Sequence, residues 1–473
     1  MMTTAIRKLA TILEDRLTML LAASAIGVYL LVLVGATTSL LHANDACTTW
    51  PTCNGSLIAV SSPAMAIAWG HRVLAIVVGV LIATTAVVAW YSSGPRIGGI
   101  VAVAALLYPV QAALGALIAL EGASRLLTAG HLTVAVSIFS AILLGLLWRL
   151  ESRHGAPTRQ PSTANQSFED LEPRSSETAG QESYGWGTIA MAYFRMTKPR
   201  LMWLLALVAM ASMGLAAGPA LEAETVVWTI TGGVLAVGSS GTFNQVLERD
   251  RDQYMDRTSD RPVVTDVIPP RRAIAFGVAL AGLSVVVFLA FVNPLAAALG
   301  VLAILFYTVV YTMILKPHTE HNTVLGGAVG AFPALIGWAA VTNEVGMPAV
   351  VLGLVVFLWT PAHFYNLALA YKDDYARAGY PMLPVTAGEA VTRRHILGYL
   401  GATLVASVVL GTASELGWVY AVGTVAVAVV FLLAVVGLFR EQTENAAFRA
   451  FHASNAYLGI VLLAIVFDTL LVA

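Results

Sequence analysis

The chain has 473 residues, of which 58% are hydrophobic and 11% are charged, whereas soluble domains carry roughly 25% charged residues. This composition excludes a soluble protein and is typical of a protein that crosses a membrane many times. The 26 basic and 27 acidic residues leave a net charge of -1, so the charge balance indicates no nucleic-acid partner.

Apolar runs of membrane-spanning length fall into two groups along the chain. Four lie near residues 18–41, 65–91, 97–119 and 128–149. A second series follows near 199–218, 225–247, 271–292, 294–315, 323–342, 346–370, 393–413, 417–438 and 450–472. The sequence therefore predicts an all-α polytopic membrane protein, with a four-helix N-terminal bundle and a bundle of about nine helices, thirteen in all.

The segment between the two groups, residues 151–187, is rich in Ser, Thr, Pro, Glu and Gln and has no apolar run or period. Such a segment buries too little surface to fold by itself, so we interpret it as a disordered polar linker. The predicted domains are 1–150 and 188–473.

The basic residues predict the orientation of the chain, because Lys and Arg concentrate in cytoplasmic loops. If the N-terminus is cytoplasmic, all of the 26 Lys and Arg residues except Arg72 and Arg125 fall on the cytoplasmic side. The first apolar run is too long for a removable signal peptide and lacks a small-residue cleavage site. We therefore expect a multi-pass protein of the cell membrane with a cytoplasmic N-terminus.

The loop after the first predicted helix holds Cys47 and Cys53. In this topology the loop faces the oxidising side of the membrane, where a cysteine pair at this spacing can close a small loop through a disulfide. Two free thiols are the alternative.

Two histidines lie at matched depth in the first group of helices. His71 is in the first turns of the second predicted helix and His131 is in the first turns of the fourth. Both helices run inward, so both imidazoles lie in the outer half of the membrane, where two of them can ligate one heme iron between helices. A single intramembrane histidine is more often a hydrogen-bonded packing residue, but a pair favours a bound heme.

A dense polar stretch begins inside an apolar helix of the second group. Asn244, Glu248 and Asp252 are four residues apart, so they share one helix face and present a row of oxygen ligands. Mg²⁺ is usually bound by one or two carboxylates together with substrate phosphates. Arg257 and Arg261 follow, and arginine offers a bidentate fork to phosphate. The stretch predicts a site for Mg²⁺ and a diphosphate; a solvated loop of paired charges is the alternative.

A second acidic cluster, Lys372-Asp373-Asp374, follows another apolar helix at its cytoplasmic end. Taken alone, the two aspartates would be an ordinary pair of charges at a helix end. Two acidic clusters on the same side can hold metal ions on opposite sides of one diphosphate. We therefore expect Asp373 and Asp374 to be catalytic, Asp374 to ligate the metal, and Lys372 to bind the diphosphate.

The spacing Asn244-x3-Glu248-x3-Asp252 resembles the first aspartate-rich motif of the intramembrane prenyltransferases of the UbiA superfamily. Over about residues 190–473, the runs ERDRDQYMDRTSDRP, YTMILKPHTEHNTVLGG, WTPAHFYNLALAYKDDY and AGYPMLPV are similar to the heme O synthase family. The resemblance implies a nine-helix fold and a Mg²⁺-dependent transfer of farnesyl from farnesyl diphosphate to a vinyl group of heme B, giving heme O for terminal oxidases. Glu248 stands where many members have Asp. The Lys372-Asp373-Asp374 run departs from the spacing of quinone-forming relatives, which favours heme as acceptor.

The chemistry of such a transfer assigns further roles. Metal together with four basic residues would stabilise the leaving diphosphate; these are Lys198, Arg257, Arg261 and Lys316. His363 lies inside an apolar helix, where a buried histidine is unfavourable unless it has a partner. The resemblance places His363 in the motif that faces the heme acceptor, and core packing is the alternative.

The first domain resembles one four-helix half of the eight-helix heme A synthase family over about residues 15–150. The resemblance rests on the CTTWPTC loop, His71-Arg72, Gln111 with Gly115, and His131. The family usually has Glu three residues before the first histidine, and Ala68 occupies that position. Because that carboxylate is implicated in the oxidation, we expect this half to bind or deliver heme rather than to oxidise heme O.

Two other functions remain open. One is a prenyltransferase acting on a quinone or lipid acceptor, and the other is a non-catalytic heme carrier, which would not need paired acidic clusters. The expected partners are farnesyl diphosphate, heme B, membrane lipid, and heme A synthase or oxidase assembly proteins.

Overall fold

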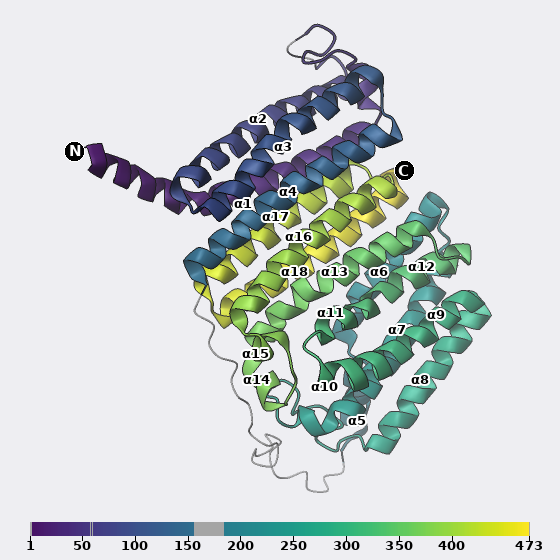
Figure 1. The fold of residues 1–473 in the computed structure, drawn as a ribbon. Helices are drawn as coiled ribbons and strands as arrows, with labels where there is room; N and C mark the ends of the chain where they lie inside the picture. The colour runs from purple at the N-terminus through teal and green to yellow at the C-terminus, as the bar shows by residue number, and fades with distance from the viewer. Residues whose placement is uncertain (1, 57, 59, 156–183, 473) are drawn as a thin grey trace. The chain divides into compact units, whose positions relative to one another are not determined.

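The computed structural model describes residues 2–56, 58, 60–155 and 184–472, which form helices without a β-strand (Figure 1). In this part of the chain, 13 helical segments are long and apolar enough to cross a membrane. The all-α polytopic class and the expected number of spanning helices are thereby confirmed. Most of the predicted linker, residues 156–183, lies outside the described residues.

The chain divides into two compact units. The first unit comprises Met1–Gly155 and Ser407–Glu441, and the second comprises Ala156–Ala406 and Gln442–Ala473. The boundaries of these units are not those of the predicted domains. Residues 407–441 group with the first unit, whereas the sequence predicts that they belong to the second domain.

The first unit contains α1 (Met2–Leu40), η1 (Ala43–Ala46), α2 (Pro63–Ser92), α3 (Pro95–Glu121), α4 (Arg125–His154) and α17 (Trp418–Glu441). Helix α16 (Glu389–Ala413) belongs to the second unit up to residue 406. The other helices of the second unit are α5 (Trp186–Met196), α6 (Pro199–Ala217), η3 (Gly218–Ala220), α7 (Ala223–Asp252), α8 (Pro270–Phe291), α9 (Pro294–Leu305), η4 (Phe306–Leu315), α10 (Lys316–His318), α11 (Asn322–Gly326), η5 (Gly327–Ala331), α12 (Phe332–Thr342), α13 (Met347–Ala370), α14 (Lys372–Arg377), α15 (Leu383–Thr386), α18 (Glu444–Phe467) and η6 (Asp468–Val472).

Several helices begin at start signals that the sequence carries. The Ser62 side chain accepts a hydrogen bond from the Met65 amide, and Pro63 is the first residue of α2. The Asn293 side chain accepts one from the Ala296 amide in the same way at the start of α9. A polar cap followed by proline satisfies a free amide and presets the backbone angle, which fixes where each helix begins.

Small residues allow α7 and α8 to pack closely. The Ser284 hydroxyl donates a 2.8 Å hydrogen bond to the Gly232 carbonyl, and the Ser239 hydroxyl donates one of 2.8 Å to the Gly277 carbonyl. Within a membrane, such close approach and interhelical hydrogen bonding hold helices together. This packing fixes α7, the helix that carries the polar stretch Asn244–Asp252.

Two of the predicted helices are not regular. The run predicted at 294–315 changes from α9 into the π-helical segment η4 at Phe306. The run predicted at 323–342 is α11, then η5, then α12. At Gly326 a Cβ atom would lie 2.4 Å from the Tyr311 ring, so the missing side chain lets α11 approach η4.

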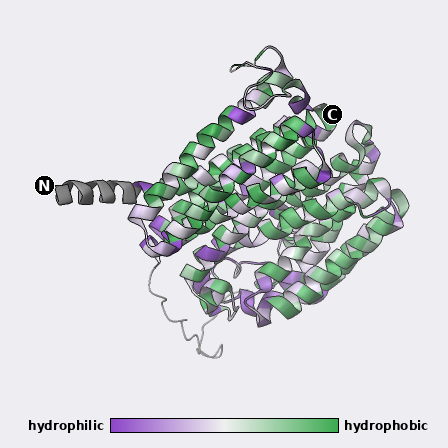
Figure 2. Cartoon of the chain, turned by 45° about the horizontal axis from the view of Figure 1, so that its top comes forward, coloured by the Kyte–Doolittle hydropathy of each residue, from purple (hydrophilic) through white to green (hydrophobic). Residues whose placement is uncertain are grey.

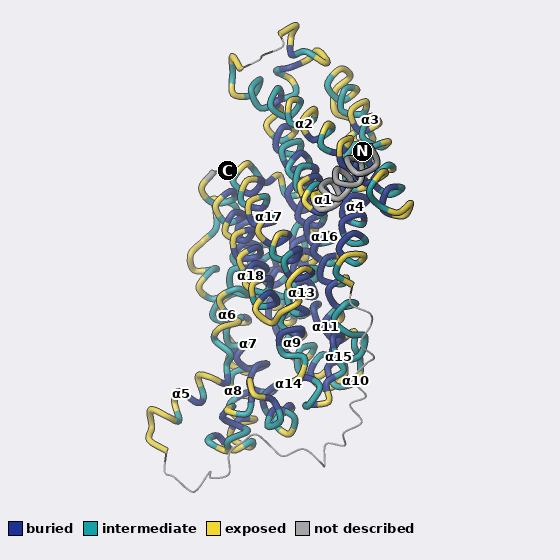
Figure 3. The backbone as a smooth tube through the Cα atoms, turned by 90° about the vertical axis from the view of Figure 1, so that its left-hand side faces the viewer, coloured by how far each residue is buried: buried dark blue, intermediate teal, exposed yellow. Residues whose placement is uncertain are grey.

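The helices are covered mostly by hydrophobic residues, while hydrophilic residues gather at helix ends and in connecting segments (Figure 2). Buried and exposed positions occur together along many of the helices (Figure 3). On α8, for example, Gly277 and Ser284 are buried, whereas Ile274 and Val278 are exposed. This pattern is expected of helices with one side on protein and one on lipid.

Candidate active site

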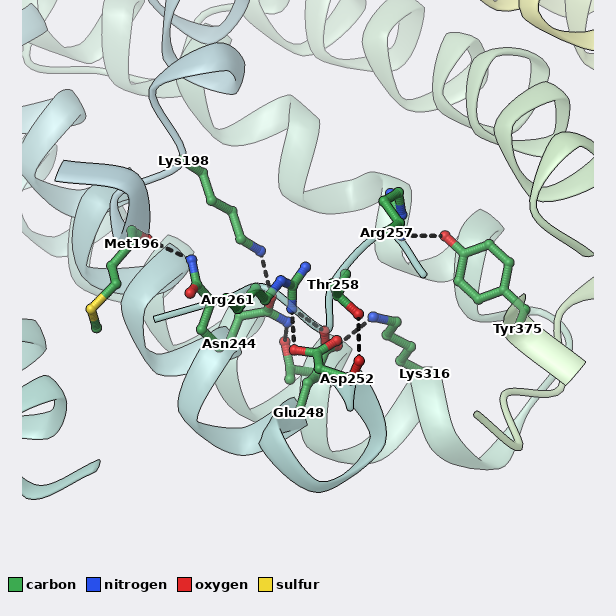
Figure 4. A network of polar contacts seen from close by, with 12 residues as sticks. Met196, Lys198, Asn244, Glu248, Asp252, Arg257, Thr258, Arg261, Lys316 and Tyr375 are labelled. Atoms are coloured by element: carbon green, nitrogen blue, oxygen red, sulfur yellow. Dashed lines mark hydrogen bonds and ion pairs between the residues drawn. The ribbon is translucent and has the colours of Figure 1, made fainter. Parts of the chain in front are cut away.

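The polar stretch of α7 forms the centre of a buried network in the second unit (Figure 4). The side chains of Asn244, Glu248 and Asp252 point to one side of the helix, and these residues are 2%, 3% and 1% exposed. Charged groups held this far from water need partners. The sequence prediction that these three residues share one face agrees with their arrangement.

Basic side chains from three separate segments meet this row. The Lys316 ammonium pairs with Glu248 Oε1, and the Arg261 guanidinium pairs with Asp252 Oδ2. Arg261 also lies 3.5 Å from Glu248 Oε2. The Lys198 ammonium donates to Asn244 Oδ1. The network therefore joins α7 to the start of α6, to the loop after α7 and to the end of η4.

The charges in this network do not balance. The network contains three basic side chains, Lys198, Arg261 and Lys316, but only two carboxylates, Glu248 and Asp252. In their usual charge states these five groups leave one excess positive charge. Burial alone would lower the pKa of Arg261, but the charges of Asp252 and Glu248 outweigh that effect and raise it. Burial lowers the pKa of Lys198. A buried excess of positive charge is an environment that an anion would neutralise.

The second acidic cluster reaches the network through Asp374. This buried carboxylate accepts a hydrogen bond from the Arg257 amide at 3.3 Å and pairs with Arg377. Arg257 in turn donates to the Tyr375 hydroxyl at 3.0 Å, and Arg377 pairs with Asp256 at 2.9 Å. The loop after α7, which carries Arg257, and helix α14, which carries Asp374, are thereby tied together.

Two predicted site residues are not part of this arrangement. Asp373 is exposed at the start of α14. Lys372 pairs with Glu389 at the start of α16. Both side chains therefore lie apart from the buried network, and their assigned roles remain predictions.

Several residues of the network are not found by reasoning from the sequence. The Tyr307 hydroxyl accepts a 3.2 Å hydrogen bond from Lys198, and the Thr312 hydroxyl accepts one of 3.1 Å from the Asn244 amide nitrogen. The ring of Tyr380 lies under the Lys316 ammonium, 4.5 Å from the ring centre. Burial raises the pKa of Tyr380, so its hydroxyl remains protonated. The one sequence feature that could have indicated this part of the network is the presence of two tyrosines, Tyr307 and Tyr311, shortly before Lys316.

An apolar cavity adjoins the network on the side of Lys198. It holds about 840 Å³ of space not filled by protein atoms, including the part open to solvent. Its walls come from α6, α7, α9, η4, η5 and α12, and Lys198 and Tyr307 are among the few polar residues that line it. An apolar lining with a few polar groups is typical of sites for small apolar ligands.

His363 is enclosed on both ring faces. Trp359 stacks on one side at 4.2 Å between ring centres, and Phe451 stacks at 4.4 Å. Its Nδ1 lies 2.8 Å from the Ser454 hydroxyl. Both ring faces and Nδ1 are therefore occupied by contacts within the protein, and contact of His363 with heme remains a prediction.

The first unit contains the predicted disulfide and both histidines. Cys47 and Cys53 are joined by a disulfide, and the Arg72 guanidinium holds the loop through the carbonyls of Cys47, Thr49 and Thr52. These three hydrogen bonds, of 2.6–2.8 Å, attach the loop to α2 directly beside His71.

The two histidines of the first unit lie close enough to interact electrostatically. A Cβ atom at Gly35 would lie 3.0 Å from the His71 ring, and one at Gly115 would lie 3.2 Å from the His131 ring. The Gln111 amide lies 3.1 Å from His131 Nε2. Among the described residues, both Nδ1 atoms are buried without a hydrogen-bond partner. Two buried imidazole nitrogens without a partner are consistent with the predicted heme ligands.

Comparison with protein families shows which class this fold and site define. The profile of the UbiA prenyltransferase family matches residues 204–459, which is more than half of the chain. The chain therefore belongs to the UbiA prenyltransferase family and is a membrane-embedded prenyltransferase. The profile of the cytochrome oxidase assembly proteins COX15-CtaA matches residues 18–171, so the first part is similar to that family.

Individual relatives match almost the full length of the chain. A protoheme IX farnesyltransferase of Haloarcula marismortui is 55% identical over 95% of this chain and 98% of its own length. One of Halobacterium salinarum is 52% identical over 96% of this chain. Protoheme IX farnesyltransferase 1 of Saccharopolyspora erythraea is 42% identical over 90% of its own length but only 59% of this chain. The prenyltransferase part therefore also exists without the first part.

A solved structure shares the fold of the second part. The structure of digeranylgeranylglyceryl phosphate synthase has a TM-score of 0.50 and 17% identity, and it covers 60% of this chain and 99% of its own. At this identity the likeness concerns the fold alone.

Proposed function

We propose that the second unit transfers a farnesyl group from farnesyl diphosphate to a vinyl group of heme B, with hydration, to give heme O. The observation that carries the proposal is the junction at Lys198, where a buried network with excess positive charge opens onto an apolar cavity. One ligand that joins an anionic head to an apolar chain satisfies both halves of this site. The names of the full-length relatives support farnesyl and heme as substrates.

The diphosphate would bind at the cationic side of the network. Lys198, Arg261 and Lys316 now face carboxylate or amide oxygens, and phosphate oxygens are ligands of the same kind. Arg257 lies one turn before Arg261 and is steadied by Tyr375, so it can add a further fork to the phosphate.

The residues of the network also fit Mg²⁺. Among the described residues no group of three or more His, Cys, Asp or Glu could hold a metal ion by itself. Mg²⁺ does not require such a cage, because one or two carboxylates with phosphate and water suffice. We therefore assign Asn244, Glu248, Asp252 and Asp374 as the residues that would hold it. Bound Mg²⁺ supplies positive charge to the diphosphate.

The reaction itself needs no nucleophilic side chain. The allylic C–O bond breaks, and its electron pair leaves with the diphosphate, whose new charge Lys198, Arg261 and Lys316 stabilise. The vinyl π electrons of heme B form the new C–C bond with the farnesyl cation. Water then adds to the resulting cation and loses a proton, which leaves a hydroxyethylfarnesyl group. The apolar cavity walls keep water away from the first cation.

Substitution within the network tests the proposal. In purified full-length protein with farnesyl diphosphate, Mg²⁺ and heme B, Asp252→Asn is expected to lower kcat for heme O formation at least 100-fold, measured by mass analysis of the extracted heme. Asp250→Asn is the matched control, because this carboxylate lies on the same helix but is exposed and outside the network. Undiminished heme O formation by Asp252→Asn would overturn the metal assignment. If the wild-type protein prenylates a quinone or lipid instead of heme, the assignment of heme B as the acceptor is overturned.

The first unit is proposed to bind heme, held by His71 and His131. The orphaned Nδ1 atoms of both imidazoles support this proposal. Ala68 is buried and packs in a cluster with Cys47 and Cys53, so no acidic group stands at that position. Heme binding or delivery, rather than heme oxidation, is the function that these residues favour.

The spectrum of bound heme tests this second proposal. The full chain loaded with heme B is expected to show a low-spin spectrum of bis-imidazole heme, which the double substitution His71→Ala, His131→Ala removes. His42→Ala is the control, because its side chain is 85% exposed in the loop. A spectrum that is unchanged in the double variant would refute the assignment.

The location of the protein and its partner proteins are also proposals. We propose a multi-pass protein of the cell membrane whose N-terminus and prenyltransferase network face the cytoplasm, in line with the distribution of basic residues. Heme A synthase and oxidase assembly proteins are the proposed partners, since they would use heme O.

A further inference from the structure

The apolar cavity has two distinct ends. Lys198 and Gly241 mark the end at the charged network, where the Lys198 side chain lies within 3.2 Å of the position of a Cβ on Gly241. Ala209, Thr229 and Ile336 line the opposite end, deeper in the membrane-spanning part of α6, α7 and α12. The cavity is therefore a channel that follows the helices away from the network.

The length of this channel follows from helix geometry. Gly241 and Thr229 are both lining residues of α7, and at 1.5 Å of rise per residue they lie about 18 Å apart along the helix. Lys198 and Ala209 mark a similar interval along α6. An extended chain of three isoprene units, built from C–C bonds of about 1.5 Å, reaches about 15 Å. A fourth unit would bring the chain to about 20 Å, beyond the deep end.

Thr229 differs from Thr231 and Thr242 on the same helix. Threonine in a helix commonly donates its hydroxyl to a carbonyl one turn earlier, as Thr231 does to Val227 and Thr242 does to Gly238. Thr229 is 1% exposed, and its hydroxyl has no hydrogen-bond partner among the described residues. The unpartnered hydroxyl belongs to a residue that lines the cavity, so Thr229 can contact a ligand there.

The walls around the deep end leave little room for adjustment. A Cβ on Gly337 would lie 2.4 Å from the Ala209 carbonyl oxygen, so α6 and α12 are in direct backbone contact beside the cavity. Ile336 packs in a buried cluster with Phe288. Tightly packed interiors resist expansion, so a longer ligand cannot simply push these helices apart.

We propose that Ala209 and Thr229 end the channel and thereby limit the prenyl group to three isoprene units. This inference rests on the proposed function, because it takes the cavity as the site of the prenyl chain. In this proposal, two residues outside the charged network determine whether a geranyl, farnesyl or geranylgeranyl donor is preferred.

Competition between donors of different length tests the inference. The purified full-length protein receives equal concentrations of geranyl, farnesyl and geranylgeranyl diphosphate with Mg²⁺ and heme B, and the mass of each prenylated heme is measured. The wild type is expected to favour the farnesyl product. Ala209→Leu and Thr229→Leu each add bulk at the deep end and are expected to raise the ratio of geranyl to farnesyl product at least tenfold.

Two controls separate chain length from other effects. Thr229→Val removes the hydroxyl but keeps the shape, so the product ratio should stay within twofold of wild type. Ala303→Leu adds bulk near the charged end, one turn from Tyr307, and should lower all three products together without shifting their ratio. If a leucine variant at the deep end does not fold, Ala209→Val takes its place, with a smaller shift expected.

The possible failures are distinguishable. No prenylated heme from the wild type with any donor would overturn the proposed function. Farnesylated heme from the wild type, with an unchanged product ratio in the folded deep-end variants, would overturn only the assignment of Ala209 and Thr229.

Discussion

Lys198 shows how one residue connects the charged and apolar parts of the site. Its ammonium donates to Asn244 and Tyr307, and its position at the mouth of the apolar cavity brings a cation to the place where a diphosphate head would lie. It is enclosed by apolar helices, so burial opposes its charged form. Pairing with an anionic ligand would remove that disadvantage.

The pH dependence of substrate binding follows from the lowered pKa of Lys198. Burial brings this pKa below the usual value of 10.5, so the ammonium loses its proton, and its attraction for diphosphate, at a lower pH than an exposed lysine. The KM for farnesyl diphosphate is therefore expected to rise with pH in a range below 10.5. Neighbouring groups that influence this titration are Tyr307, Arg261, Glu248 and Lys316.

Lys198→Arg should remove this rise in KM, because a guanidinium stays charged throughout the range. Equal pH profiles for wild type and Lys198→Arg would contradict the prediction. Between the lowered and the usual pKa the unfolded state binds more protons than the folded state, so the free energy of unfolding should also rise with pH in this window.

At the scale of secondary structure, regular spacing decides what a sequence can predict. Asn244, Glu248 and Asp252 could be placed on one face because α7 is a regular α-helix throughout. Tyr307 and Thr312 could not be placed, because they lie in the π-helical segment η4, where the turn contains more residues than in an α-helix. The π-helical turn therefore brings Tyr307 and Thr312 to Lys198 and Asn244 at positions that an α-helical pattern does not predict.

The connection to the second motif illustrates a different limit. The sequence could place Asp374 at a helix end, but its pairing with Arg377 and the Arg257 amide depends on how the loop after α7 folds back. That loop has no periodic pattern. The sequence alone could not distinguish the role of Asp373 from that of Asp374. The structure distinguishes them, because Asp374 is on the buried side of α14 and Asp373 is on the exposed side.

Packing between α6 and α12 should depend on Gly337. A methyl group there would lie 2.4 Å from the Ala209 carbonyl oxygen, so the two helices would have to separate. We expect Gly337→Ala to destabilise the protein by about 1–3 kcal/mol, as overpacked cores do. Thermal unfolding of the purified protein measures the effect as a lower Tm.

Gly282→Ala on α8 is the control for this substitution, because nothing lies within 4 Å of a Cβ at that position. Its Tm is expected to match that of the wild type. An equal Tm for both variants would show that the α6–α12 contact is looser than described.

At the scale of the whole molecule, composition and apolar run length were enough to predict thirteen spanning helices, and the described residues contain 13. Which helices become neighbours could not be predicted, because the apolar runs are alike. Neighbours are selected by small residues and single hydroxyls, such as Gly232 with Ser284, whose partners lie far away in the sequence.

The orientation of the chain can be tested on intact cells with a membrane-impermeant maleimide. The native cysteines are joined in a disulfide, so introduced cysteines are the expected targets. Ala123→Cys and Glu344→Cys, at exposed positions in loops that are external in the proposed topology, should be labelled. Gly94→Cys and Asp373→Cys, at exposed positions that are cytoplasmic in the proposed topology, should be labelled only after the cells are opened. The reverse pattern would contradict the proposed topology.

The position of the charged network at the end of α7, with the cavity extending into the spanning part of α6 and α7, has a consequence for how the products separate. In the proposed reaction the diphosphate is formed at the aqueous boundary and dissolves in water, whereas the farnesylated heme is more lipophilic than its precursor and remains in the bilayer. The two products therefore enter different phases. Their re-encounter is rare, and the reverse reaction is suppressed by partitioning rather than by any further contact with the protein.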